Sequence, residues 1–144
     1  MKDVWSNRIV GYSISDRMTS KLAVDALENA VAARGDVAGC IVHADRGSQF
    51  RSRRMAAALN RHRMVGSMGR VASASDNAAM ESFWSLLQTN VLNQRRWTTR
   101  QELRLAIVVW IERKYHRQRE QDRLGGLTPI EYEDRMSQPR ELAA

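Results

Sequence analysis

The sequence predicts an α/β protein with helices in its C-terminal half. Residues 8–15 alternate apolar and polar side chains with a period of two, as in a half-buried strand. Residues 20–34 repeat small and aliphatic side chains at helical spacing, and residues 40–43 form a short apolar run typical of a buried strand. A strand, a helix and a second strand in succession favour a right-handed crossover with parallel pairing.

Length and cysteine usage limit the class of protein. A chain of 144 residues can form a single domain with a hydrophobic core. No apolar run is long enough to cross a bilayer and no secretory leader follows Met1, so we expect a cytoplasmic protein without a membrane partner. Cys40 has no second cysteine with which to pair, and its apolar neighbours predict a core position.

The positive charge is unevenly distributed along the chain. The formal net charge is +7, and the stretch from Arg46 to Arg70 contains seven arginines and no acidic residue. Such a basic segment suits a polyanionic partner. Charge alone also fits a basic domain whose arginines are simply solvated.

Start and stop signals define the first helix and the strand after it. Thr19 or Ser20 can cap the helix, and Gly35 can end it. Its apolar face comprises Leu22, Ala23, Ala26, Leu27, Ala30 and Val31. The strand over residues 40–43 is apolar on both faces, so we expect it to be covered on each side. Asp45 would then lie at the carboxyl edge of a parallel sheet, where α/β proteins bind ligands.

The middle of the chain predicts a short helix, a brief strand, a loop and a longer helix. Ser52 can cap the short helix, residues 64–68 form the strand, and residues 69–75 form the loop. Ser75 or Asp76 can cap the next helix. Its apolar face comprises Met80, Phe83, Trp84, Leu87 and Val91. Glu81 lies off that face and can point toward the sheet edge. Gln88, seven residues on, shares the face of Glu81 by the 3.6-residue repeat.

Two capping boxes define the C-terminal helices. The first, Thr99 to Glu102, opens a long helix that ends in a basic cluster. Its predicted buried side comprises Leu103, Ile107, Trp110 and Ile111. The glycine pair at residues 125–126 breaks this helix. Thr128 to Glu131, with Pro129 at the first helical position, opens a short terminal helix.

Asp45 and Glu81 are the candidate metal ligands. An Asp at the end of a strand, a Gly-Ser turn and a Glu on a helix can place two hard oxygen ligands at one divalent cation. The alternatives are an ordinary turn for Asp45 and a solvated helix position for Glu81. We interpret Asp76 as a helix cap, His43 as a hydrogen-bonded core histidine, and the tryptophans at positions 84, 97 and 110 as core residues.

Four blocks of residues, in order along the chain, resemble the catalytic core of insertion-sequence transposases with an Asp-Asp-Glu (DDE) triad. The blocks are Arg8–Gly11, His43–Phe50, Asp76–Phe83 and Leu124–Pro129. The resemblance implies a ribonuclease-H-like integrase core and two divalent metals, normally Mg²⁺ (or Mn²⁺). It also implies phosphoryl transfer on DNA, by cleavage at the element ends and strand transfer to a target. By matching position, Asp45 would be the second acid of the triad and Glu81 the third.

The resemblance also indicates what differs here. Family members carry the first acid on a strand upstream of the segment that corresponds to residues 4–14, so we expect an N-terminally truncated core over residues 1–135, a tail over residues 136–144, and no independent activity. Many relatives have Lys where Gln88 stands. The alternatives are a non-catalytic module that binds nucleic acid or another subunit, and a remnant of a disrupted element.

The candidates for DNA contact lie in the matching blocks and in the basic helix end. They are Arg46, Ser48, Gln49, Arg70, Asn77, Gln88, Arg113, Lys114, His116 and Arg117. Cations at the end of a long helix also have a simpler explanation, because they interact favourably with the helix dipole. The expected partners are DNA and either a second copy of this chain or an intact transposase subunit.

Overall fold

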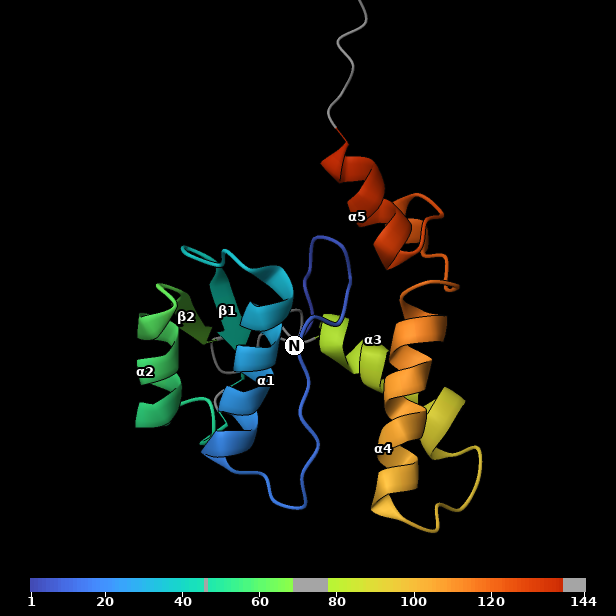
Figure 1. The fold of residues 1–144 in the computed structure, drawn as a ribbon, viewed down its shortest axis with the longest axis horizontal. Helices are drawn as coiled ribbons and strands as arrows, with labels where there is room; N and C mark the ends of the chain where they lie inside the picture. Colours follow the sequence, from blue (N-terminus) through green and yellow to red (C-terminus); the bar gives the residue numbers. More distant parts are fainter. Residues whose placement is uncertain (46, 69–77, 139–144) are drawn as a thin grey trace, which may run out of the picture. The chain divides into compact units, whose positions relative to one another are not determined.

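The computed structural model describes residues 1–45, 47–68 and 78–138, which mix helices with one small parallel sheet (Figure 1). The chain forms two compact units: unit 1 contains residues 1–2 and 10–85, and unit 2 contains residues 3–9 and 86–144. The division falls inside a helix, between Ser85 and Leu86, and therefore within the segment expected to form one core. In the described ranges, no helix is both apolar enough and long enough to span a membrane.

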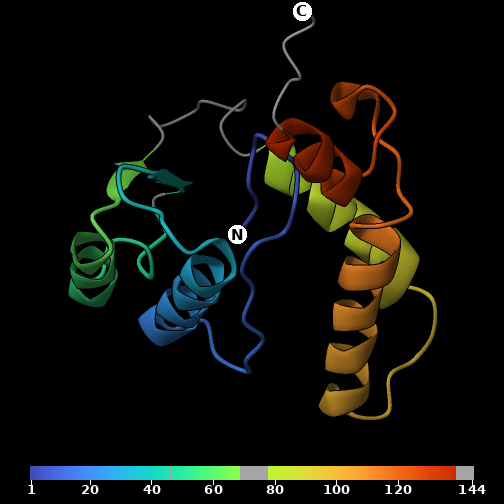
Figure 2. The ribbon, with the colours of Figure 1, turned by 45° about the horizontal axis from the view of Figure 1, so that its top comes forward.

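The helices and strands alternate only in unit 1. In chain order they are α1 (Ser20–Arg34), β1 (Ile41–Ala44), α2 (Arg53–Arg61), β2 (Val65–Met68), α3 (Ala78–Leu87), η1 (Gln88–Leu92), α4 (Arg100–Val109), η2 (Trp110–Tyr115), η3 (Asp122–Leu124) and α5 (Pro129–Ser137). Two of these, η1 and η2, are π-helical, and η3 is a 3₁₀ turn. The two π-helical segments directly continue α3 and α4, and Figure 2 shows α4 running on into η2.

The predicted limits of α1 and the predicted start of α2 are confirmed. The Thr19 hydroxyl accepts a hydrogen bond from the Leu22 N–H, and Gly35 ends α1 with φ of 76°, which favours glycine. The Ser52 hydroxyl caps α2 in the same way, through the Met55 N–H. Local chemistry is therefore sufficient to define both helices.

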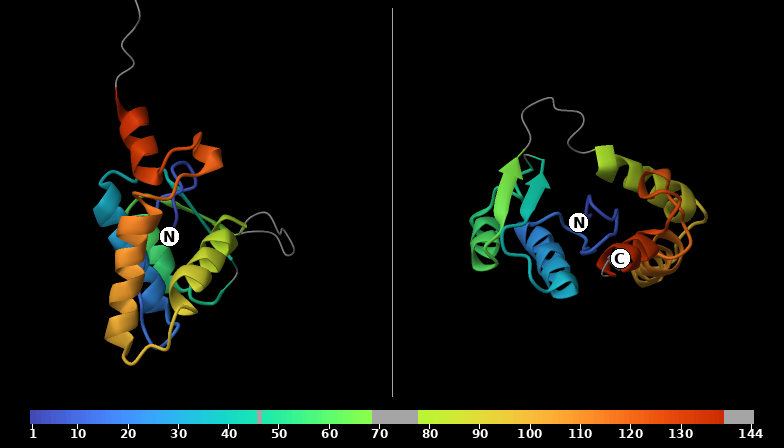
Figure 3. Two further views of the ribbon diagram at one scale, coloured as in Figure 1. Left: turned by 90° about the vertical axis from the view of Figure 1, so that its right-hand side faces the viewer. Right: turned by 90° about the horizontal axis from the view of Figure 1, so that it is seen from above.

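The sheet consists of β1 and β2, which pair in parallel from Ile41↔Val65 to Ala44↔Met68. Figure 3 shows the two strands side by side. Both strands were predicted. The predicted crossover, however, joined residues 8–15 to residues 40–43 through the first helix, whereas in the structure α2 joins β1 to β2. The predicted strand over residues 8–15 is wrong. Residues 10–15 are irregular, and the N–H groups of Val10 and Gly11 donate to the carbonyl of Met1 instead of a strand. Alternation alone does not make a strand, since a strand also needs a hydrogen-bonding neighbour.

Within the described part of unit 1, only one face of the sheet is covered. Val42 packs against the core cluster built on Leu27, Met55 and Ala58. Because side chains alternate along a strand, Ile41 points to the opposite face, where it is 69% exposed. The expectation of a strand covered on both sides is therefore wrong. Cys40 and His43 are exposed and are not core residues, and His43 Nδ1 lies 3.3 Å from the hydroxyl of its register partner Ser67.

The backbone at Gly11 lies very close to α1. A Cβ at position 11 would lie 2.2 Å from the carbonyl oxygen of Ala26 and 2.7 Å from Cβ of Ala30. These neighbours are backbone atoms and a short side chain of a helix, so they cannot move aside as a flexible side chain would. Because Gly11 has no side chain, the backbone at this position can pack directly against α1.

We expect Gly11→Ala to lower the free energy of unfolding by about 1–3 kcal/mol, because the added methyl group must displace α1. Urea unfolding followed by circular dichroism measures this loss. The control is Gly66→Ala, whose Cβ would meet only the side-chain end of Leu59, at 3.1 Å. An equal, small effect of the two substitutions would contradict the close packing of Gly11.

The predicted apolar face of α3 is confirmed in part. Phe83, Leu87 and Val91 are buried, whereas Trp84 is 55% exposed. Neighbouring residues on a helix point about 100° apart, so a face narrow enough to bury Phe83 leaves Trp84 outside. The π-helical η1 begins at Gln88, directly after the α-helical turns that carry Glu81. That Gln88 shares the face of Glu81 stays a prediction.

The C-terminal helices begin where the sequence predicts. The Thr99 hydroxyl accepts a hydrogen bond from the Glu102 N–H, but the Glu102 carboxylate accepts from the Thr98 N–H, one residue before the cap.

At α5 the capping box formed by Thr128 and Glu131 is complete. Hydrogen bonds from Thr128 hold the pKa of Glu131 below its ordinary value. The long helix ends earlier than predicted, since η2 stops at Tyr115; Gly125 and Gly126, both with positive φ, follow the 3₁₀ turn η3 instead. On the predicted buried side of the long helix only Ile111 is fully buried.

Unit 2 also contains residues 3–9, which lie against the C-terminal helices. Ser6 and Asn7 are buried, and the hydroxyl of Tyr115 donates to the Asn7 carbonyl, at 3.1 Å. Glu133 accepts hydrogen bonds from the Ser6 hydroxyl at 2.6 Å and from the Arg8 guanidinium at 2.8 Å. A segment from the start of the sequence is thus held in unit 2 by polar contacts with α5 and η2.

Candidate metal and DNA site

Asp45 follows β1 directly and is exposed, as predicted for a ligand at the carboxyl edge of a parallel sheet. Its Oδ1 accepts a hydrogen bond from the Gly47 N–H at 2.8 Å. A Cβ at position 47 would lie 2.8 Å from that oxygen and 2.5 Å from Nε2 of Gln49. Because Gly47 has no side chain, the Asp45 carboxylate can approach the backbone N–H at this position. The Asp45 carboxylate has further lone pairs that could bind a cation.

The turn after Asp45 is held by its own hydrogen bonds. The Gly47 carbonyl accepts from the N–H groups of Phe50 (3.0 Å) and Arg51 (3.3 Å). The Ser52 hydroxyl donates to the Gln49 carbonyl at 2.9 Å and accepts from the Met55 N–H at 3.1 Å. Residues 47–52 thus form a hydrogen-bonded turn that leads into α2.

Glu81 lies in the first turn of α3 and is exposed. A carboxylate in this position also stabilises the helix through its dipole, so its location alone does not require a metal. The Lys2 ammonium donates to the Ala79 carbonyl in the same turn, at 3.1 Å. Asp45 and Glu81 belong to the same unit, but no group of three or more His, Cys, Asp or Glu residues in the described part of the chain could hold a metal ion. That the two acids hold one cation remains a prediction.

The chemistry of this pair fits Mg²⁺ or Mn²⁺. Both acids offer hard oxygen donors, and Mg²⁺ is typically held by one or two carboxylates together with waters and substrate phosphates. The exposure of both side chains leaves room for such additional ligands. Asp45 and Glu81 are therefore the residues that would hold the ion.

The structure describes only some of the predicted DNA contacts. Ser48, Gln88, Arg113, Lys114 and Arg117 are exposed, and Gln49 is half-buried. Arg46, Arg70 and Asn77 lie outside the described residues, as does the predicted cap Asp76.

His116 is buried, contrary to the expectation of a surface contact with phosphate. It is only 1% exposed, and its Nε2 accepts the Ile9 N–H at 3.0 Å. The ring proton must then be on Nδ1, which donates to Glu112 at 3.2 Å. Burial lowers the pKa of His116, and Glu112 partly opposes that effect. The sequence contains no signal for this role, because the partner Ile9 is more than a hundred residues away.

Comparison with known proteins gives the family. Two models, both described as integrase core domain, match residues 1–74 and residues 62–129. Transposase InsF for insertion sequence IS3A of Escherichia coli (strain K12) is 38% identical over 133 residues, which cover 92% of this chain and 46% of InsF. The insertion element IS600 uncharacterized 31 kDa protein of Shigella sonnei is 36% identical over 138 residues, or 96% of this chain and 51% of that protein.

A solved structure is also similar in fold. It is the simian T-cell lymphotropic virus intasome in complex with PP2A regulatory subunit B56 gamma, with a TM-score of 0.66 and 15% identity. The match covers 88% of this chain and 43% of that one. The chain spans about half the length of the curated relatives that it matches. It belongs to the integrase core domain family.

Proposed function

We propose that this chain is part of the catalytic core of an insertion-sequence transposase and acts in DNA transposition, by metal-dependent cleavage and strand transfer. The observation that carries the proposal is the position of Asp45, exposed at the end of β1 and oriented by Gly47, within a match to the integrase core domain. InsF, named as a transposase, aligns over 92% of the chain. The finer assignment to a ribonuclease-H-like fold is part of the same proposal.

In this proposal Asp45 and Glu81 hold Mg²⁺ or Mn²⁺, as the second and third acids of a DDE triad. The ion, when bound, would stabilise the charge that develops on a DNA phosphate during in-line displacement. The turn after Asp45 keeps the carboxylate in place, and Ser48 and Gln49 offer hydrogen bonds to DNA beside it. Arg113, Lys114 and Arg117 supply positive charge for phosphates, and Gln88 can donate a hydrogen bond without long-range attraction.

We further propose that residues 1–144 bind metal and DNA without cleaving DNA on their own. Two carboxylates can retain an ion that also binds water and phosphate, but no third ligand joins them among the described residues. Cleavage would then require a further acid that is not among the described residues. The bacterial relatives suggest that this chain acts on DNA in the bacterial cytoplasm.

The test replaces Asp45 by Asn and follows Mn²⁺ binding and duplex-DNA binding of the full chain. We expect Asp45→Asn to lower Mn²⁺ affinity at least about tenfold, because it removes a charged ligand but keeps the shape of the side chain. Electron paramagnetic resonance of free Mn²⁺ gives the metal affinity, and fluorescence anisotropy gives the DNA affinity.

The matched control is Asp36→Asn. Asp36 is also exposed in unit 1, and its Oδ1 accepts the N–H two residues on, from Ala38 at 3.1 Å, as Asp45 does from Gly47. Asp36→Asn should leave Mn²⁺ affinity unchanged. If Asp45→Asn also leaves the metal response unchanged while DNA affinity is retained, the chain is a non-catalytic basic module, the second function that its charge supports.

A further inference from the structure

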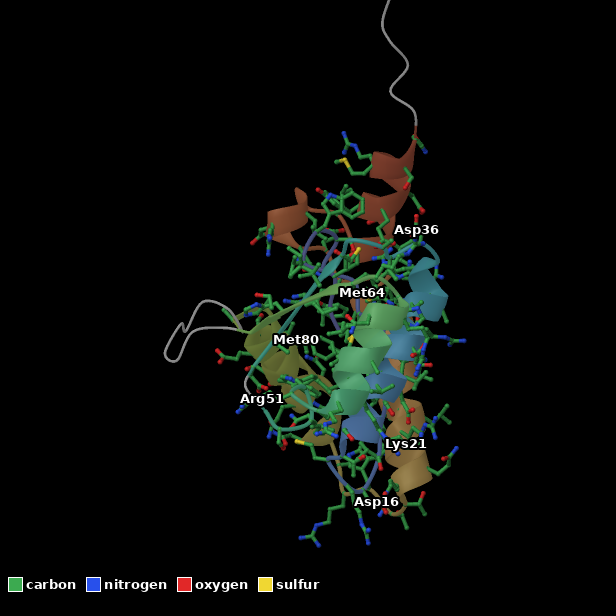
Figure 4. The ribbon with its side chains drawn as sticks, turned by 90° about the vertical axis from the view of Figure 1, so that its left-hand side faces the viewer. Asp16, Lys21, Asp36, Arg51, Met64 and Met80 are labelled. Carbon is green, nitrogen blue, oxygen red and sulfur yellow. The ribbon has the colours of Figure 1, made fainter. Side chains whose placement is uncertain are left out.

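Three arginines at the start of α2 form an exposed basic surface in unit 1. We name Arg51, Arg53 and Arg54 the arginine face; all three are exposed. Figure 4 places Arg51 at the end of α2 that is remote from Met64. None of these residues is among the candidates for DNA contact that the sequence suggested.

The arginine face has no acidic partner among the described residues, and the contrast with the other end of α2 is clear. There, the Arg61 guanidinium lies 3.1 Å from Oε1 of Glu28 on α1, and His62 lies 2.9 Å from Oε2 of the same carboxylate. At the start of α2 the first turn contains no acid. The positive charge of the arginine face is therefore not neutralised within the described part of unit 1.

Packing does not explain these arginines either. α2 is buried through Met55 and Ala58, which join Leu27 of α1 in the core cluster. Arg53 precedes Met55 by two residues and so points roughly 200° away from it around the helix. Cations at this end of a helix also oppose the helix dipole, so their location costs stability. Since the charges of the arginine face do not stabilise the fold, we interpret these residues as binding residues.

The arginine face lies close to Asp45 in the sequence, after the hydrogen-bonded turn over residues 47–52. The Gly47 N–H donates to Asp45, the Gly47 carbonyl accepts from the Arg51 N–H, and the Ser52 hydroxyl begins α2. Arg51 is six residues from Asp45 and Arg54 is nine, and such segments span at most about 20 and 30 Å, so the arginines lie within about one turn of duplex DNA of any phosphate held at Asp45. Substituting the side chain of Arg51 leaves its backbone hydrogen bond in place.

We infer that the arginine face binds the backbone phosphates of duplex DNA beside Asp45. The inference rests on the proposed function, and it names a DNA surface of the same site. Guanidinium groups match phosphate geometry, and contacts to phosphate carry no sequence information directly. The arginine face therefore contributes affinity and position on the DNA, and not recognition of a particular sequence.

The test compares the full chain with the triple variant Arg51→Gln, Arg53→Gln, Arg54→Gln in a salt titration on labelled duplex DNA. Each phosphate neutralised by a protein cation contributes about 0.9 to the slope of log affinity against log salt concentration. We expect the slope of the triple variant to be smaller by between about 2 and 3, equally on two duplexes of unrelated sequence. Glutamine is a good helix former, so α2 should persist, as circular dichroism will show.

The control is Arg61→Gln, which removes a cation from the same helix and should leave the salt slope unchanged because Glu28 already pairs with it. A triple variant that keeps the wild-type slope would overturn the inference, and so would one whose loss is confined to a single sequence. Loss of Mn²⁺ binding in the triple variant would also overturn it, since the arginines would then support the turn. If the wild-type chain shows no salt-dependent DNA binding, the proposed function itself fails.

Discussion

Replacing His116 by Ala is expected to lower the free energy of unfolding by roughly 3 kcal/mol. The side chain is 1% exposed, so its removal leaves a cavity in unit 2. The Ile9 N–H, buried with it, also loses the acceptor that now lies at 3.0 Å. Urea unfolding measures the total loss, and amide hydrogen exchange at Ile9 reports the broken hydrogen bond directly.

His116→Gln separates the two contributions. The carboxamide oxygen of glutamine can accept the Ile9 N–H, so we expect a smaller loss than with alanine and partial protection of the Ile9 amide. If the two variants lose the same stability and the Ile9 amide exchanges equally fast in both, the hydrogen bond to His116 does not hold residues 3–9 in unit 2.

The lowered pKa of His116 also predicts how the free energy of unfolding depends on pH. Burial lowers the pKa of the folded ring below its ordinary value of about 6.5, and the nearby Arg8 lowers it further, while Glu112 and Glu133 partly oppose both. The unfolded chain therefore binds the proton at a higher pH than the folded chain. The contribution of His116 is fully present above about pH 6.5 and is lost as pH falls toward the lowered pKa of the folded ring. This part of the pH dependence should disappear in His116→Gln.

Replacing both candidate ligands should show whether they hold the same cation. We expect Asp45→Asn and Glu81→Gln each to weaken Mn²⁺ binding at least about tenfold, which corresponds to about 1.4 kcal/mol. If one ion contacts both carboxylates, the double variant should bind Mn²⁺ hardly more weakly than either single variant, because the first substitution already removes their joint coordination of the ion. Mn²⁺ titrations of the four proteins complete this cycle.

The cycle has a control in Glu120→Gln, which removes an exposed carboxylate in unit 2. It should change Mn²⁺ affinity by less than twofold, roughly the limit of non-specific charge effects. Losses at Asp45 and Glu81 that simply add would mean two independent weak sites, and the assignment of a shared metal would be wrong.

Much of the candidate site could be predicted because its parts are local. The apolar run before Asp45 indicates a strand, and a carboxylate directly after a strand lies at the sheet edge whatever packs around it. The helix that carries Glu81 is equally local, since its apolar repeat is visible in the sequence. The hydrogen bond from Gly47 was not predicted, although a Gly two residues after an Asp is a common turn signal.

Predictions that depended on distant partners failed more often. Residues 8–15 have the alternation of a strand but bond to Met1 and pack on α1 through Gly11. Ile41 is apolar but exposed, because it points away from the face of β1 that the described residues of unit 1 cover, and Cys40, just before β1, is exposed as well. His116 has basic neighbours along the chain, yet its contacts are made with Ile9 and Glu112.

The sequence by itself determined where four helices begin, since Thr19, Ser52, Thr99 and Thr128 each accept a hydrogen bond from a backbone N–H three residues on. It also determined the family, through short blocks that contain Asp45 and Glu81. Only the tertiary structure decided which apolar side chains are buried, which strands pair, and that His116 holds residues 3–9. Caps depend on neighbours within one turn, whereas burial and pairing depend on residues that folding brings together from distant parts of the chain.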